Sequence, residues 1–238
     1  MKKFMLLLSV LVLPVFTVNS NAQFWKNAKK YIQQNSGGLS EDEAARGIKE
    51  ALEKGTNSGV EIVSKVDGYF GDPQIKIPFP PDAQVIESKL RAIGLGDKVD
   101  EVVLTINRAA EDAAKEAKPI FVAAIRNMSI RDAINIVKGE EDAATQYLKK
   151  NTSVELNAKF QPVIKNSLDK VEATKHWEEV INIYNKIPFV KKMNPDLTAY
   201  VTQKAIDGLF VMIAKEEKKI REDPMARTTE LLKKVFGN

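Results

Sequence analysis

The chain has 238 residues, a formal net charge of +4 and no cysteine, and 44% of its residues are hydrophobic. A chain of this length can bury a large core without disulfides. The lack of cysteine excludes thiol chemistry and cysteine-ligated metals, and basic residues scattered among acidic ones argue against a nucleic-acid-binding surface. We therefore expect one folded domain without a cofactor or a nucleic-acid partner.

The first 22 residues have the three parts of a secretory signal peptide. Lys2 and Lys3 form the charged part, residues 4–18 the apolar part, and residues 20–22 a small-residue cleavage site. A membrane anchor is the alternative, but the apolar run is shorter than the roughly 20 residues that a span needs. Cleavage leaves a mature chain that begins at Gln23, with a net charge of +2. Because there is no cysteine to acylate, we expect a soluble, periplasmic protein that is not lipidated.

Residues 23–38 are expected to form a flexible arm that ends in Asn-Ser-Gly-Gly, and residues 39–238 a single α-helical domain. Ser40 and Glu43 form a capping box, which begins a helix to about Lys65. Glycine inside a helix costs roughly 1 kcal/mol relative to alanine. Three glycines in this helix therefore predict close approach by another element: Gly47, Gly55 and Gly59.

Residues 67–82 alternate apolar and polar side chains as a strand does, with Ile75, Ile77 and Phe79 on one side. Prolines 78, 80 and 81 exclude a central strand. We expect an extended, proline-rich crossover over about residues 70–81 that lies on the helical body. A proline-rich ligand for a partner's groove is the alternative interpretation.

The remainder predicts helix after helix with short turns, an all-α, bundle-like domain. A helix over 82–93 ends at Gly94, and an alanine-rich helix over 97–127 is kinked at Pro119. Further helices are predicted over 129–139, 140–149, from Thr152 to about 168, from Thr174 to about 188, and over 194–223. Ser129 with Asp132 and Thr152 with Glu155 are the start signals of two of them, and Asn194 is the N-cap of the last.

The helix over 194–223 has the clearest apolar stripe: Leu197, Val201, Ala205, Leu209, Met212, Ile213 and Ile220. Pro224 begins a shorter helix with a second stripe, formed by Leu231, Leu232, Val235 and Phe236. No nucleotide-binding, metalloprotease, serine-hydrolase or calcium-binding motif occurs. His176 is the only histidine, and a capping or surface role is the preferred interpretation. We therefore assign no catalytic or metal-ligating residue.

Two polar groups remain as candidate sites. Glu216 falls on the apolar arc of the 194–223 helix with Glu217 near its edge, and a buried carboxylate needs a partner or a proton. A structural role, capping another helix or pairing with an arginine, is preferred over a general base or cation ligand. Arg227, Thr228 and Thr229 stand in the first turns of the last helix, where N–H groups favour an anion or a lipid head group. The alternative is that Asp223 caps this helix and that Arg227 forms an ion pair with Glu222 or Glu230.

The sequence resembles an uncharacterised exported bacterial family, domain of unknown function 4197, from about Leu39 to the C-terminus. The resemblance rests on Asp132-Ala133, Gly139, Ala143-Ala144-Thr145, Tyr147, Tyr184-Asn185, Pro188, Asp207 to Phe210, Glu216-Glu217, Ile220-Arg221, Pro224, Ala226 to Thr229 and Phe236-Gly237. It implies no activity, cofactor or partner. It does imply that one set of residues belongs to a shared feature: Thr145, Tyr147, Glu217, Arg221, Arg227, Thr228 and Thr229.

We therefore expect an exported helical binding or interaction module. Its expected ligand is an anionic or lipid-like small molecule, with the residues just named and Glu216 as the binding site. A hydrolase-like enzyme using Glu216 or Glu217 with Arg227 is one alternative. A structural scaffold that dimerises through apolar helix faces is the other, so a homo-oligomer remains open.

Overall fold

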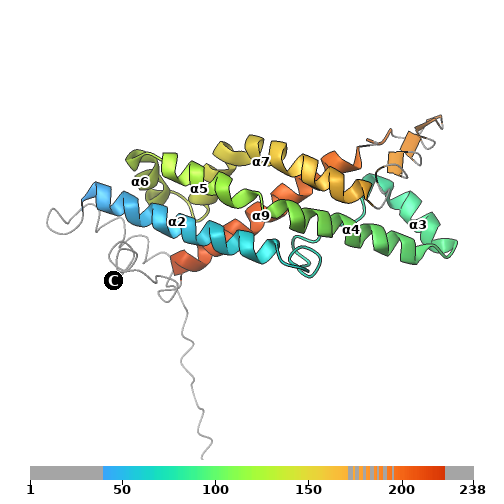
Figure 1. The fold of residues 1–238 in the computed structure, drawn as a ribbon, viewed down its shortest axis with the longest axis horizontal. Helices are drawn as coiled ribbons and strands as arrows, with labels where there is room; N and C mark the ends of the chain where they lie inside the picture. Colours follow the sequence, from blue (N-terminus) through green and yellow to red (C-terminus); the bar gives the residue numbers. More distant parts are fainter. Residues whose placement is uncertain are drawn as a thin grey trace, which may run out of the picture.

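The structure of the protein, a computed structural model, describes residues 40–170, 174, 177–178, 181–182, 185–186, 188–189, 192–194 and 196–222. Within these residues all regular secondary structure is helical, which confirms the all-α, bundle-like prediction. The helices lie side by side in an elongated bundle, with α3 (Gln84–Ala92) near one end and α6 (Ile130–Lys138) near the other (Figure 1).

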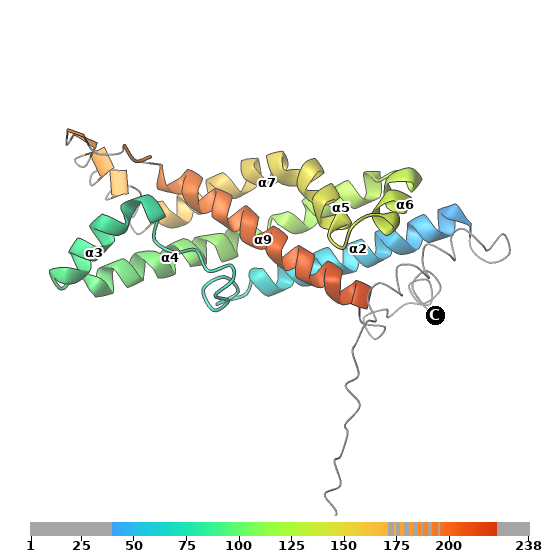
Figure 2. The same ribbon diagram turned by 180° about the vertical axis from the view of Figure 1, so that it is seen from behind.

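One long helix, α9 (Leu197–Glu222), crosses the bundle and contacts α2 (Glu41–Val63), α4 (Gly96–Ala114) and α7 (Ala143–Asp169) (Figure 2). The whole stripe predicted for it is buried. A large core runs along α4, α7 and α9. A smaller second core joins α2 and α6 to the end of α5 (Ala117–Asn127) and to the ends of α7 and α9.

The glycines of α2 allow α9 to approach closely, as their cost predicted. A Cβ built on Gly55 would lie 3.1 Å from Cδ1 of Ile220, and one built on Gly59 would lie 3.0 Å from Cδ1 of Ile213. Because the lower number on α2 faces the higher number on α9, the two helices run in opposite directions. The prediction of close packing within a bundle is therefore confirmed.

The proline-rich crossover also forms as predicted. Residues 64–80 contain no regular secondary structure and lead from α2 to a short 3₁₀ turn, η1 (Pro81–Ala83). The alternating apolar side chains of Ile75, Ile77 and Phe79 are buried in the main core. α9 meets the crossover closely, because a Cβ built on Gly208 would lie 2.7 Å from Cε1 of Tyr69.

Helix starts are predicted well at serines and less well elsewhere. The hydroxyls of Ser40 and Ser129 each accept the N–H of the residue three positions later, and the backbone N–H of each serine donates to the carboxylate of that same residue. The start predicted at Thr152 is wrong, because α7 runs unbroken from Ala143 to Asp169. Thr152 is buried and its hydroxyl donates to the carbonyl of Leu148 at 2.7 Å. Inside a helix, a threonine hydroxyl can donate to the carbonyl four residues earlier, so the same residue type fits a helix interior as well as a helix start.

The kink predicted at Pro119 is a break between α4 and α5, which ends α4 at Ala114. Proline has no N–H to donate to the carbonyl four residues earlier, so the helix stops in the preceding turn. The start of α9 is shifted from its predicted position, because Asp196 and not Asn194 caps it. Oδ1 of Asp196 accepts the N–H of Ala199 at 2.9 Å.

The signal peptide (1–22), the arm (23–38) and the short helix after Pro224 lie outside the described residues, as does about half of the helix predicted from Thr174. Among the described helices, none combines the length and apolar character that a membrane crossing requires.

Candidate functional site

Glu217, near the end of α9, caps α7 from outside that helix. Its carboxylate accepts the N–H of Ala144 at 3.1 Å, the N–H of Thr145 at 2.8 Å and the hydroxyl of Thr145 at 2.7 Å. The first N–H groups of a helix have no partner within it, and the helix dipole places positive charge there. The carboxylate is therefore held by the N-terminus of a helix that lies about 70 residues earlier in the chain.

Arg221, one turn further along α9, supplies the opposite charge. Its Nε donates to Oε1 of Glu217 at 2.9 Å, and its Nη2 donates to the same oxygen. Nη2 also lies 3.5 Å from the carbonyl oxygen of Ile136 on α6. The side chains of Arg221 and Glu217 are only 7% and 5% exposed. This buried ion pair links α6, α7 and α9.

A small, open pocket lies beside the ion pair; its cavity volume is about 30 Å³, and about 350 Å³ when the solvent at its mouth is counted. Its apolar wall is formed by Ile48, Ala51 and Leu52 of α2, Ile136 and Val137 of α6, Ala144 of α7 and Ile220 of α9. Glu217 and Arg221 complete the wall. A concave, largely apolar site with a few polar groups is the usual form of a small-molecule site.

Glu216 was predicted to be a buried carboxylate that caps another helix or pairs with an arginine. The structure corrects the second part of this prediction. It is buried, but no hydrogen bond or ion pair involves it within the described part of the chain. The helix-capping and arginine-pairing role expected of it belongs to Glu217. The two residues are 100° apart around α9, and only Glu217 faces the N-terminus of α7.

The structure brings together three of the predicted site residues: Thr145, Glu217 and Arg221. Tyr147 packs against both cores, and burial followed by the charge of Asp132 raises its pKa above the usual value. Within the described residues no hydrogen bond joins Tyr147 to Glu217. Four other residues lie outside the described part of the chain: Arg227, Thr228, Thr229 and His176.

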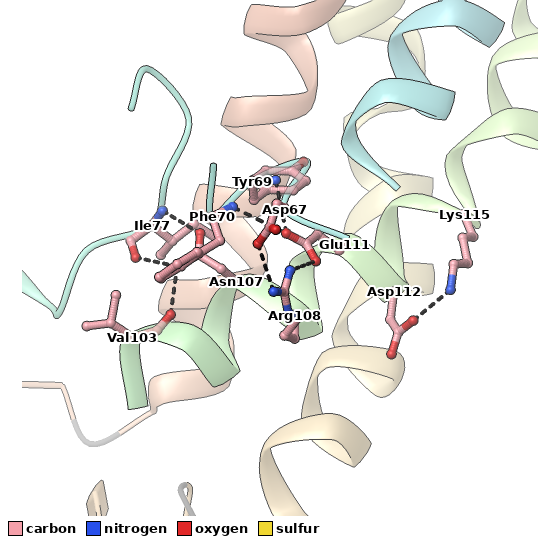
Figure 3. A network of polar contacts seen from close by, with 10 residues as sticks. All are labelled: Asp67, Tyr69, Phe70, Ile77, Val103, Asn107, Arg108, Glu111, Asp112 and Lys115. Atoms are coloured by element: carbon pink, nitrogen blue, oxygen red, sulfur yellow. Dashed lines mark hydrogen bonds and ion pairs between the residues drawn. The ribbon is translucent and has the colours of Figure 1, made fainter. Parts of the chain in front are cut away.

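A second buried polar cluster was not predicted (Figure 3). Glu111 on α4 accepts the N–H groups of Tyr69 and Phe70 at 3.1 and 3.2 Å, and its second oxygen lies 2.7 Å from Nη1 of Arg108. Arg108 also bonds Asp67 at 2.8 Å. These contacts fix the start of the crossover on α4.

One turn earlier on α4, Asn107 holds the crossover again. Its Oδ1 accepts the N–H of Ile77, and its Nδ2 donates to the carbonyl oxygens of Ile77 and Val103. Asn107 is fully buried. Asn107 and Glu111, two polar residues four apart beside an alanine-rich seam, are the sequence signal that could have identified this cluster.

The crossover is also tied to α9. The hydroxyl of Tyr69 donates to the carbonyl of Ala205 at 2.6 Å, and burial, with a smaller effect of Glu111, raises the pKa of Tyr69 far above its usual value. Lys215 pairs with Asp72 at 3.1 Å. Every polar side chain of this cluster is engaged with the protein itself, so we interpret the cluster as structural.

The ion pair has little capacity for catalysis as it stands. The two oxygens of Glu217 accept from five donor atoms, which leaves no open position for a substrate proton. Within the described residues no three His, Cys, Asp or Glu side chains form a group that could hold a metal ion.

Comparison with known protein families matches residues 38–237 to a family described as protein of unknown function, DUF4197. The match covers most of the chain, so the protein belongs to this family. Comparisons with curated proteins and with solved structures give no match.

Proposed function

We propose that this DUF4197 protein is a binding module that holds an apolar, lipid-like group in the pocket between α2, α6, α7 and α9. The observation that carries this proposal is the apolar wall beside a buried ion pair. Glu217 neutralises Arg221, so the pocket offers a ligand apolar surface and little net charge. Burial of apolar ligand surface contributes about 25 cal/mol per Å².

Residues that carry the family resemblance gather around this pocket. Ala144, Glu217, Ile220 and Arg221 line it, and Thr145 binds Glu217 directly. Residues on which the family resemblance rests therefore border a hollow in the surface. This coincidence favours a binding role over a purely architectural one.

An anionic head group on the ligand stays a prediction. Arg227, Thr228 and Thr229 were expected to bind it, and they follow closely after Glu222, where α9 ends beside the pocket. A hydrolase-like enzyme has less support, because Glu217 is occupied by hydrogen bonds and ion pairing. The dimerising scaffold also stays a prediction, and sedimentation of the purified protein tests it.

The experiment is a titration with cis-parinaric acid, a fatty acid whose fluorescence rises in an apolar site. We expect saturable binding to the full chain and a loss of about tenfold or more in affinity for Ala51→Leu, which fills the pocket with about three methyl(ene) groups. Ala158→Leu is the matched control, because Ala158 is exposed on α7. Absence of saturable binding, or equal affinity in both variants, contradicts the proposal.

We also propose that the protein is exported and acts in the periplasm. The support is the charged, apolar and small-residue order of residues 1–22. The intact mass of the protein recovered from the periplasm is expected to correspond to a chain beginning at Gln23. A mass that retains residues 1–22 contradicts this prediction.

A further inference from the structure

We propose that α6 is a movable lid of the pocket, which moves away from α2 when the apolar chain of a ligand enters. This inference deepens the proposed function, because it names the wall of the pocket that gives way and the route by which the chain enters. It rests on the proposed function for the ligand alone. The movement of α6 is a property of the protein and is measured without a ligand.

The first observation is the size of the pocket. Its cavity volume of about 30 Å³ is close to the volume that one water molecule occupies in the liquid. An apolar cavity that binds benzene has a volume of about 150 Å³. The chain of a lipid-like ligand is larger than benzene, so at least one wall of the pocket must move before the chain fits.

The second observation is that three of the four walls are long helices held in the main core. α2, α7 and α9 have 23, 27 and 26 residues. Each also contributes side chains to the main core, for example Val60 of α2, Leu148 of α7 and Leu209 of α9. Moving any of these helices away from the pocket would therefore also expose apolar surface in the main core. These three walls are fixed.

The third observation is that α6 is held by the pocket region alone. It has 9 residues and lies near one end of the bundle (Figures 1 and 2). Its buried side chains, Ala133, Ile136 and Val137, all belong to the second core, and the last two line the pocket. When α6 moves, the apolar surface that it loses against α2 is covered again by the ligand, which offsets the cost of opening.

Polar contacts hold α6 weakly to the other helices. Within the described residues, one hydrogen bond joins α6 to another helix, from Nη2 of Arg221 to the carbonyl oxygen of Ile136 at 3.5 Å. This distance is long, because N–H···O bonds usually measure about 2.7–3.2 Å. The capping bonds between Ser129 and Asp132 belong to α6 itself and move with it. Opening of the lid therefore breaks one weak hydrogen bond between helices.

Both ends of α6 provide positions at which the chain can bend. Ser129 before the helix and Gly139 after it are exposed, and both have extended backbone conformations. Hinges of moving elements are usually a few residues at the ends of helices or in loops. Met128, one residue before Ser129, is buried in the second core, so the movement starts after it.

The first test measures the movement of α6 without a ligand, by thiol labelling of the full chain, which has no cysteine of its own. Ala133→Cys places a thiol on the buried face of α6, and Ala113→Cys in the main core is the matched control, because both alanines are fully buried. We expect Ellman's reagent to label position 133 at least about tenfold faster than position 113, because local opening is more frequent than global unfolding.

Urea denaturation of each variant gives the labelling rate that global unfolding alone allows. The lid requires position 133 to exceed this rate, whereas position 113 is expected to match it. Equal labelling of the two positions, or a rate at 133 that global unfolding explains, overturns the lid.

The second test uses exposed positions, where substitution leaves the core intact. Spin labels on Asn135→Cys of α6 and Val154→Cys of α7 report the distance between these helices, and the control pair is Lys204→Cys of α9 with Val154→Cys. We expect cis-parinaric acid to change the first distance and not the second. If the fatty acid saturates the protein and the first distance stays the same, the lid is overturned and the proposed ligand stands. If no fatty acid binds, the proposed function fails, and the labelling of position 133 decides the lid by itself.

Discussion

Glu216 and Glu217 are neighbours in the sequence and both are buried, yet their surroundings differ. Glu217 holds the start of α7 and the guanidinium of Arg221, whereas Glu216 packs its stem near Gly55. Periodicity places both residues near the apolar face of α9, but it does not say which carboxylate meets a helix N-terminus. That depends on the position of α7, which lies far away in the sequence.

We predict that Glu217→Ala lowers the free energy of unfolding by about 3–5 kcal/mol, because it removes one side of a buried ion pair with Arg221 and uncaps α7. Glu216→Ala is the adjacent control, and its cost is expected to be below about 1 kcal/mol. Urea denaturation followed by circular dichroism measures both values. Equal losses in the two variants contradict the assignment of the buried pair.

Asn107 is the second residue whose removal is expected to be costly. Asn107→Leu keeps the branched side chain with the same number of heavy atoms but leaves the N–H and carbonyl of Ile77 without this partner in the core. We expect a loss of about 2–4 kcal/mol in the free energy of unfolding. Asn151→Leu is the control, because Asn151 is exposed on α7. A loss for Asn107→Leu no larger than that of the control contradicts the role of Asn107.

At the scale of the element, contacts between helices explain where local signals succeed and where they fail. The capping boxes at Ser40 and Ser129 are satisfied within four residues, so the sequence alone predicts them. Thr152 carries the same sequence signal for a helix start, yet it lies in the interior of α7. Packing against α4 and α9 stabilises α7 as one continuous helix through this position. The cost of glycine in α2 predicted a close neighbour, but only the structure identifies it as α9.

Replacing glycine by alanine is predicted to change the stability of the protein by different amounts in α9 and in α2. Gly208→Ala places a Cβ 2.7 Å from the ring of Tyr69, which is fully buried and bonded to Ala205, so we expect a loss of about 1–3 kcal/mol. Gly55→Ala meets only the flexible end of Ile220 and gains helix propensity, so its effect is expected to stay within about 1 kcal/mol. Thermal and urea denaturation of both variants check this difference.

The link between the crossover and α9 is predicted to depend on pH through Asp72. The N–H of Gln74, and to a lesser extent Lys215, hold the pKa of Asp72 below its usual value. The carboxylate therefore contributes stability above the unfolded pKa of about 4 and loses it as the pH falls through the folded pKa. Both Asp72 and Lys215 are partly exposed, so this contribution is about 1 kcal/mol or less.

Urea denaturation of wild type and Asp72→Asn at pH 7 and at pH 2.5 tests this linkage. We expect the variant to be less stable at pH 7 and the difference to shrink at the lower pH. A difference that grows as the pH falls contradicts the sign of the pKa shift.

At the scale of the whole molecule, the fold class follows from the sequence and the site does not. Periodic apolar stripes and the proline-rich crossover predict a helical bundle, and the structure confirms both. The pocket arises where residues from α2, α6, α7 and α9 meet. Ile48 and Val137, for example, are ordinary core residues in sequence, and nothing local shows that they border a hollow.

The central claim, that this hollow receives a lipid-like group, is tested most directly by methyl NMR of the full chain labelled at isoleucine Cδ1 and titrated with a fatty acid. The account predicts shifts at Ile48, Ile136 and Ile220, which line the pocket, and little change at Ile106 and Ile164 in the main core. Saturation at one common concentration for the three pocket methyl groups supports a single site. An unchanged spectrum, or equal shifts at pocket and core methyl groups, contradicts it.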